Sequence, residues 1–208
     1  MGSPDRDCPF YKNGFFVIKQ IVKNRKGKKV NLQLIKLSPD SKDREFFEKI
    51  NEEAFPPSER ISFDEFFEFS AKTDADILGI YDGMAPVGFF VLLKNAECGY
   101  VFFFAIDKSR RSSGYGSAAI KKLVDTYSEQ QIILDFEILD ENAENFAQRA
   151  RRKGFYLRNG FHETGNYTIL RGDKFEVVCT GGELNRPVFK ELIHILHASF
   201  EEFPDVLI

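Results

Sequence analysis

The feature that most constrains the fold is a series of apolar segments that ends in a glycine-bearing loop. The first three segments are separated by turn residues and short polar stretches, and they cover residues 77–81, 87–93 and 99–106. This pattern predicts consecutive antiparallel strands. The third strand leads through a polar loop into a helix over 114–127 and then into an apolar strand over 132–136. Strands joined through a helix lie parallel, so we expect a mixed sheet flanked by helices.

The rest of the chain predicts further helices and hairpins around this unit. The expected elements are a hairpin over 14–37 with strands at 14–18 and 30–35 around the basic turn 23–29, a helix that begins at Ser38-Pro39 and stops at 55–57, a helix from Ser62 with Glu65 completing a capping box, a helix over 142–153, a hairpin over 161–180 and a helix over 188–200. We therefore expect one α/β domain over 31–208, preceded by an extension over 1–30 that contains the first part of the hairpin.

Composition excludes several classes of protein. The chain has 208 residues, and the 43% that are hydrophobic can supply a core, which argues against disorder. A net charge of −3 disfavours a non-specific nucleic-acid binder, and we interpret the basic run 23–29 as a solvated hairpin tip. No apolar stretch is long enough for a bilayer, and residues 1–7 lack the pattern of a signal peptide. Three separated cysteines without C-x-x-C spacing indicate neither a disulfide scaffold nor a zinc site. A soluble cytoplasmic protein is expected.

The loop before the helix at 114 has the chemistry of an anion site. A helix N-terminus presents unpaired N–H groups and a positive dipole end. Gly114 and Gly116 would allow a ligand to approach the backbone closely, and Arg110 and Arg111 add positive charge. The Gly-Lys-Ser/Thr ending of a P-loop and the G-x-G-x-x-G dinucleotide fingerprint are both missing.

Four segments together resemble the GNAT acetyltransferase superfamily, in particular its small bacterial members. Arg111-Ser-Ser-Gly-Tyr-Gly116 resembles the superfamily's Arg/Gln-x-x-Gly-x-Gly/Ala motif, and 155–161 (FYLRNGF), preceded by Arg151-Arg152, is similar to its Tyr-x-x-x-Gly-Phe element. The segments 55–60 (FPPSER) and 181–183 (GGE) are similar to elements of one subgroup. The resemblance covers about residues 31–195 and implies a mixed, mostly antiparallel sheet flanked by helices, with the N-terminal hairpin as an addition.

The resemblance also implies a cosubstrate, a reaction and a set of cofactor contacts. The implied function is transfer of an acetyl group from acetyl-CoA to a primary amine of a small molecule or protein, through a tetrahedral intermediate and without a metal. The implied acetyl-CoA contacts are Phe104, Ala105, Ile106, Arg111, Ser112, Ser113, Gly114, Tyr115, Gly116, Ser117 and Asn145. Ser112 and Ser113 depart from the Gly and the basic residue of many relatives, and Arg149 stands where an Asn is frequent.

Acetyl transfer to an amine needs a base and an acid. An alkylamine has a pKa near 10.4 and must lose a proton before it attacks, and Glu59 and Glu97 are the candidate bases. Backbone N–H groups near Ala105 and Ile106 would stabilise the intermediate. The resemblance assigns protonation of the CoA sulfur to Tyr156. We interpret the arginines and lysine of 149–158 as a solvated helix face in preference to a surface that recognises the 3′-phosphate end of CoA or an acidic partner. His194 and His197 lack a third metal ligand nearby in the sequence.

Two alternatives remain open from the sequence. The chain could be a non-catalytic acyl-CoA-binding or interaction domain that keeps the fold, or a nucleotide-phosphate-binding protein unrelated to CoA. A monomer and a homodimer are both compatible with it. The 23 phenylalanines gather partly in the two helices between 44 and 72, where most should be core. Phe69, at the edge of the second helix, is a candidate wall of the acceptor pocket.

Overall fold

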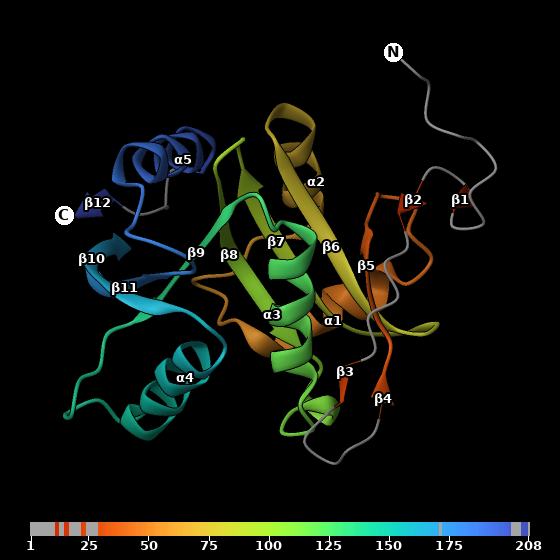
Figure 1. Ribbon diagram of the computed structural model, residues 1–208, viewed down its shortest axis with the longest axis horizontal. Coiled ribbons are helices and arrows are strands. Elements are labelled where there is room, and N and C mark those ends of the chain that lie inside the picture. Colours follow the sequence, from red (N-terminus) through yellow and green to blue (C-terminus); the bar gives the residue numbers. More distant parts are fainter. Residues whose placement is uncertain are drawn as a thin grey trace.

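The computed structural model describes residues 30–170 and 172–200, together with short strands at 11–12, 15–16, 22–23, 29–30 and 205–207 (Figure 1). The helices are α1 (Arg44–Ala54), α2 (Phe63–Lys72), α3 (Tyr115–Thr126), α4 (Phe146–Arg158) and α5 (Arg186–Ser199), with a 3₁₀ turn η1 at Lys108–Arg110. The longer strands are β5 (Leu32–Lys36), β6 (Ala75–Asp82), β7 (Ala85–Lys94), β8 (Cys98–Ile106), β9 (Gln131–Glu137), β10 (His162–Leu170) and β11 (Asp173–Cys179). The short strands are β1 (Tyr11–Lys12), β2 (Phe15–Phe16), β3 (Val22–Lys23), β4 (Lys29–Val30) and β12 (Asp205–Leu207).

The main sheet is mixed, as expected. Its strand order is β12-β10-β11-β9-β8-β7-β6-β5. Each neighbouring pair is antiparallel except β8 and β9, which α3 connects and which lie parallel. The strand–loop–helix–strand unit predicted from 99–136 therefore sits in the middle of the sheet, where it joins the two antiparallel halves.

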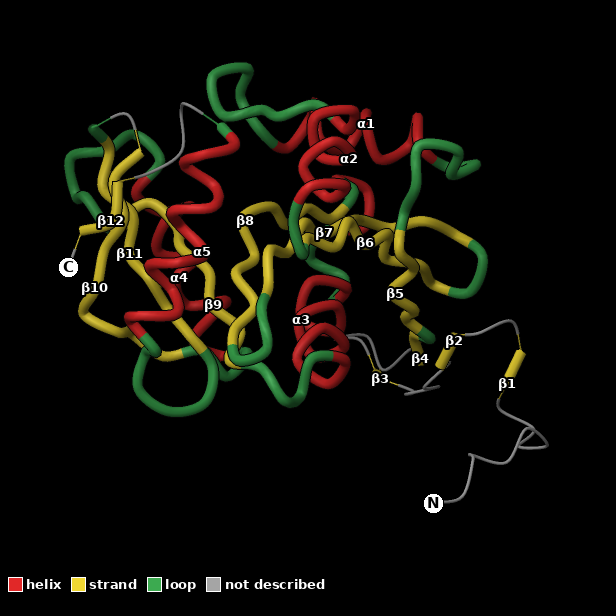
Figure 2. Tube along the Cα trace, turned by 90° about the horizontal axis from the view of Figure 1, so that it is seen from above, coloured by secondary structure: helices red, strands yellow, loops and turns green. Residues whose placement is uncertain are grey.

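Helices cover both faces of the sheet. Figure 2 shows α1 and α2 on one side of β5–β8 and α3 on the other. Side chains of α1 and α2 form a core with β6, β7 and β8, and α5 packs beside them against β8, β9 and β11. On the opposite face α3 packs on the sheet, and Phe155 and Tyr156 of α4 pack against the same core. The sheet thus separates two apolar layers.

Phenylalanines build much of the layer under α1 and α2. Phe47, Phe63 and Phe66 are at most 2% exposed, and Phe63 and Phe66 meet edge to face at 5.6 Å. Phe66 also contacts Phe103 of β8 at 4.9 Å. Edge-to-face ring pairs add to the free energy of area burial. The many phenylalanines are therefore largely a core feature.

Two helix starts show how local signals succeed and fail. The capping box at Ser62 forms as predicted: Glu65 N donates to Ser62 Oγ at 3.3 Å, and Ser62 N donates to Glu65 Oε2 at 2.8 Å. The predicted helix start at Ser38 is wrong, because α1 begins at Arg44. Ser38 N donates to Ser41 Oγ at 2.9 Å, and this turn satisfies the backbone without a helix. Similarly, α4 begins at Phe146 rather than at 142.

The predicted N-terminal hairpin is present only in a shorter form. β3 and β4 pair antiparallel, with Val22 opposite Val30, around the basic turn, whose residues 24–28 lie outside the described part. The second predicted strand becomes β5, which pairs with β6. Phe15 and Phe16 pair with β1 instead of with 30–35, and residues 14, 17 and 18 lie outside the described residues.

The two halves of the sheet separate beyond a short contact between β8 and β9. These strands pair only from Cys98–Tyr100 to Gln131–Ile133. Further along, β8 pairs only with β7, and β9 pairs only with β11. A register shift next to this point pairs Leu92 with Val101 but Val91 with Phe103, so that Phe102 is an extra residue. The sheet consequently opens into a wedge.

Within the described residues, no helix has both the length and the apolar character to cross a membrane.

The ring cluster under α2 makes a prediction about stability. Phe66 is 0% exposed, so Phe66→Ala should lower the free energy of unfolding by about 3–5 kcal/mol through lost burial and the cavity left behind. Glu68, an exposed residue two positions further along α2, provides the control. Glu68→Ala should change the free energy of unfolding by less than about 0.5 kcal/mol. Urea denaturation measures both. Equal effects of the two substitutions would contradict the packing described.

Candidate active site

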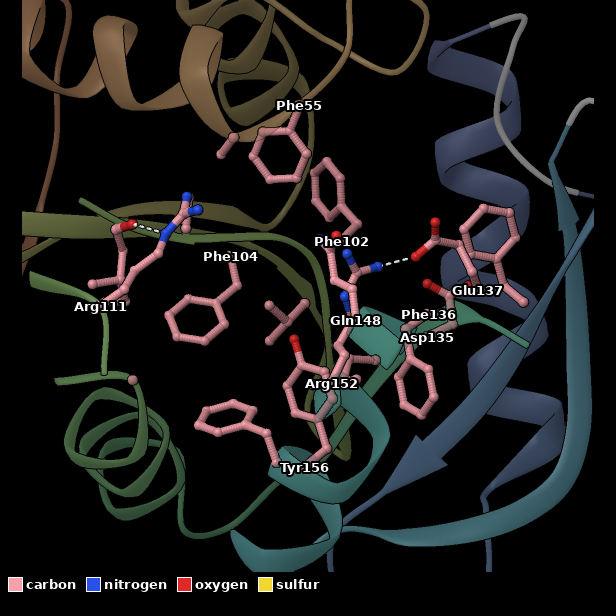
Figure 3. Close-up of a pocket in the computed structure, with 18 of the residues that line it drawn as sticks. Phe55, Phe102, Phe104, Arg111, Asp135, Phe136, Glu137, Gln148, Arg152 and Tyr156 are labelled. Carbon is pink, nitrogen blue, oxygen red and sulfur yellow. Dashed lines mark hydrogen bonds and ion pairs between the residues drawn. The ribbon is translucent and has the colours of Figure 1, made fainter. Parts of the chain in front are cut away.

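The wedge between β8 and β9 contains a cavity of about 680 Å³ (Figure 3). Both separated strands contribute to its wall, together with the loop after α1, the loop and first turn of α3, and α4. From β8 and β9 the lining residues are Val101, Phe102, Phe104, Ala105, Ile106, Leu134, Asp135, Phe136 and Glu137. Because neither strand pairs with the other here, each leaves backbone N–H and C=O groups facing the opening.

One side of the cavity is suited to an anion. Gly114 is the N-cap of α3, adopts φ +86°, and no side chain caps this end of the helix. Ser112 also has positive φ, at 60°. Arg111 donates from Nε to the carbonyl of Ile106 at 3.1 Å, which holds its side chain at the cavity wall. The free helix amides and the arginine form a positive surface for phosphate.

The adjoining helix adds two further cations to this wall. Arg152 pairs with Glu137 and, like Arg158, lines the cavity. The interpretation of 149–158 as a solvated face was therefore wrong for Arg152, whereas Arg158 is exposed as well as part of the lining. It failed for Arg152 because α4 packs on β9, where Glu137 forms an ion pair with this arginine. Lys153 on the same helix pairs instead with Glu176 at 2.8 Å.

Tyr156 presents its hydroxyl to the cavity from α4 (Figure 3). Its ring stacks on Phe136 at 5.5 Å and meets Phe161 edge to face at 5.7 Å, so the side chain is firmly oriented. Burial raises the pKa of Tyr156 to about 12; the charge of Asp135 adds to the rise and Arg152 opposes it. The hydroxyl thus keeps its proton at neutral pH and can donate it.

The side of the cavity nearest α1 combines aromatic and acidic groups. Phe55 and Phe102 lie together at this end in Figure 3, and Phe175 of β11 also lines the cavity. Glu59, exposed in the loop between α1 and α2, also lines the cavity. Phe69 does not: it is 4% exposed and packs on Phe102 at 5.8 Å. The aromatic wall is thus formed by other phenylalanines than the one singled out from the sequence.

The structure brings most of the sequence candidates to this one cavity. Those that line it are Glu59, Phe104, Ala105, Ile106, Arg111, Ser112, Gly114, Gly116, Ser117, Asn145 and Tyr156. Ser113 and Tyr115 are absent from the lining; Tyr115 is 5% exposed and its hydroxyl donates to Asp82 at 2.7 Å. Glu97 lies at the start of β8, where it accepts a hydrogen bond from Asn185 at 2.9 Å, away from the cavity.

Several lining residues were not identified from the sequence. Phe102 and Asp135 belong to no recognisable motif. They line the cavity only because β8 and β9 separate, which the sequence does not show. Gln148 and Arg152 lie one helical turn apart on a common face of α4, and Arg158 is the last residue of this helix. Within the described part of the chain, no group of three or more His, Cys, Asp or Glu could hold a metal ion.

We compared the chain with known protein sequences and structures. No curated protein sequence matches the chain. Among solved structures, a GNAT-family protein from Bacteroides thetaiotaomicron is 25% identical, with 81% of this chain and 97% of that chain covered and a TM-score of 0.64. Arabidopsis thaliana Naa50, solved with a bisubstrate analogue of CoA, is 18% identical, with 74% and 100% covered and a TM-score of 0.53. An aminoglycoside 6'-N-acetyltransferase in complex with CoA is 12% identical, with 71% and 96% covered and a TM-score of 0.55.

Residues 44–161, more than half of the chain, match the acetyltransferase (GNAT) family. This range runs from the start of α1 past α4, and so includes the wedge, the α3 loop and Tyr156. The chain belongs to the GNAT acetyltransferase family.

Proposed function

We propose that this protein transfers an acetyl group from acetyl-CoA to a primary amine of a small molecule or protein. The observation that carries the proposal is the meeting of two groups in one cavity. The uncapped N-terminus of α3 offers an anion site, and the hydroxyl of Tyr156 faces the same space. An enzyme that uses acetyl-CoA must bind its phosphates and donate a proton to the departing thiolate.

The cavity walls fit the parts of acetyl-CoA. Arg111, Arg158 and the first amides of α3 provide positive charge for the pyrophosphate. The unpaired edges of β8 and β9 provide donors and acceptors for the amides of the pantetheine arm, in the manner of an added strand. N–H groups of β8 near Ala105 and Ile106, which line the cavity, would stabilise the oxyanion of the tetrahedral intermediate.

Tyr156 is the proposed acid. With a pKa raised to about 12 by burial, it is protonated throughout the physiological range and can give its proton to the departing thiolate. For the base, Glu97 is not carried forward, because it lies outside the cavity. The base has to be a carboxylate that lines the cavity, and of the two sequence candidates only Glu59 does so.

The ligands of solved neighbours support the cosubstrate but do not indicate one acceptor. Naa50 was solved with a CoA-peptide analogue, and a protein from Elizabethkingia anophelis of 10% identity and TM-score 0.50 was solved with acetyl-CoA. At these identities the likeness shows the fold alone. The acceptor of this chain must be inferred from its own cavity.

Replacement of the proposed acid should separate chemistry from binding. Tyr156→Phe removes only the hydroxyl, so we expect kcat for acetyl transfer to fall at least about 100-fold while the affinity for CoA stays the same. Tyr167→Phe is the matched control, because Tyr167 packs against Lys174 on β10–β11 and does not line the cavity. The measurement is release of free CoA thiol, over a panel of primary amines.

Full turnover by Tyr156→Phe would remove this residue from the mechanism. CoA binding by the wild-type protein without amine-dependent thiol release would favour a non-catalytic acyl-CoA-binding domain.

The arginines of the cavity make a second prediction. Arg158→Ala should raise the Kd for CoA about 10-fold, because a charge-assisted contact to phosphate is lost. Arg151→Ala is the control: it removes the same charge from the same helix, but Arg151 is exposed and outside the cavity lining. Isothermal titration calorimetry with CoA measures both. Equal losses of CoA affinity in the two variants would mean that the overall charge of α4, and not the position of Arg158, determines binding.

A further inference from the structure

Asp135 lies in the cavity wall, and its described partners are hydroxyl groups. The Thr168 hydroxyl donates to its Oδ2, and Tyr100 also forms a side-chain hydrogen bond with it. Thr168 is 0% exposed and Tyr100 is 2% exposed. Within residues 30–169 and 172–200, no lysine, arginine or histidine forms an ion pair with Asp135. A carboxylate thus faces the cavity without a cation from the described protein.

The position of this carboxylate depends on the centre of the sheet. Tyr100 is the last residue of β8 that pairs with β9, and Asp135 follows two residues after the end of that pairing on β9. Asp135 therefore stands where the wedge begins to open, and β10 supplies Thr168 from the side. Two buried hydroxyl donors favour the charged form, whereas burial raises the pKa of Asp135 above its ordinary value.

Three phenylalanines from other elements than β9 also line the cavity: Phe55, Phe102 and Phe175. Ring faces attract cations, and an uncompensated charge in a partly desolvated wall is costly. The ionisable groups that interact with Asp135 are Tyr100 from β8 and Tyr156 from α4, and Glu137 and Arg152 line the same cavity. Arg152 is occupied by Glu137. The missing partner is consequently a cation with an apolar body.

We propose that Asp135 binds the ammonium group of the acceptor and removes its proton, and that the acceptor is a primary amine carried on an apolar or aromatic group. This inference rests on the proposed acetyl transfer and assigns its acceptor side. It assigns the base to Asp135 on β9 instead of to the sequence candidate Glu59.

The proton and bond changes balance with the groups present. Asp135 takes one proton from the ammonium, and the nitrogen lone pair then forms the C–N bond to the acetyl carbon. The C–S bond breaks, Tyr156 gives its proton to the sulfur, and it regains a proton from the nitrogen. Asp135 releases its proton to solvent. An alkylammonium and acetyl-CoA therefore give the amide, free CoA and one proton.

Burial favours Asp135 over Glu59 for this role. Glu59 is exposed in a loop, where water screens its attraction for a cation. Asp135 is held by side chains of two other strands in a wall with aromatic neighbours, so its interaction with an ammonium is stronger and its orientation is fixed. Its charge also raises the pKa of Tyr156, which places the two groups within electrostatic reach.

Kinetics with a panel of butylamine, spermidine, phenethylamine and tyramine test the assignment. Asp135→Asn should lower kcat/KM for the best amine about 100-fold or more, while Asp173→Asn, at an exposed aspartate of β11 outside the cavity lining, should lower it less than about 3-fold. The Kd for CoA should stay within about two-fold in both variants. An Asp135→Asn protein with wild-type kcat/KM, or one that loses CoA affinity in parallel, overturns the proposal.

The pH profile distinguishes a base from a structural residue. Activity should rise with pH through the pKa of Asp135. Thr168→Val removes one donor to the charged form, so the acidic limb of kcat/KM should move to higher pH, with recovery of rate above it. Asp135→Asn should lose this limb. An unchanged limb in both variants would contradict the assignment.

Equilibrium binding separates this inference from the proposed function. With the protein saturated by CoA, phenethylammonium should bind the wild type at least about 10-fold more tightly than phenethyl alcohol, and Asp135→Asn should lose this preference. If Asp135→Asn loses this preference but the wild type acetylates no amine, the proposed acetyl transfer is wrong and the ammonium site is supported. If the wild type acetylates amines but shows no preference for phenethylammonium, the ammonium site is wrong and acetyl transfer is supported. The same conclusion follows if the preference is retained in Asp135→Asn.

Discussion

The short contact between β8 and β9 is the constraint on which the rest of the structure depends. Three residues of each strand pair, and then each strand continues with its other neighbour alone. If the parallel pairing continued to Ile106, the backbone would close the wedge and the cavity would not exist. The extra residue Phe102 increases the divergence and directs an aromatic ring into the opening. A sheet that elsewhere is continuous thus has one gap, at the site of the proposed chemistry.

The two apolar layers hold this gap open from either side. On one face the ring cluster of α1 and α2 fixes β8, and on the other α3 and α4 pack against the β9 side through Tyr156 and Phe136. Gly116 lets these two helices approach, because a Cβ there would meet the ring of Phe155 at 3.2 Å. The same packing that stabilises the fold therefore orients the proposed acid and the anion-binding loop.

Local sequence signals predicted the local features of this structure. The Ser62–Glu65 capping box, the apolar strands and the glycine loop before α3 each depend on neighbours a few residues away. The errors arose where distant contacts decide. Glu97 stood next to a predicted strand, but its end of β8 is the paired end. Thr168 is 33 positions from Asp135, and only the sheet brings their side chains together. Arg152 lines the cavity because α4 packs on β9, where Glu137 forms an ion pair with this arginine.

Hydrogen exchange with and without CoA tests most directly whether the wedge is the acetyl-CoA site. The proposed function predicts that CoA slows exchange of backbone amides in residues 101–106 of β8 and in the first turn of α3, where the N–H groups face the cavity. It predicts little change in α5. Protection confined to other elements, or no protection at saturating CoA, would contradict it.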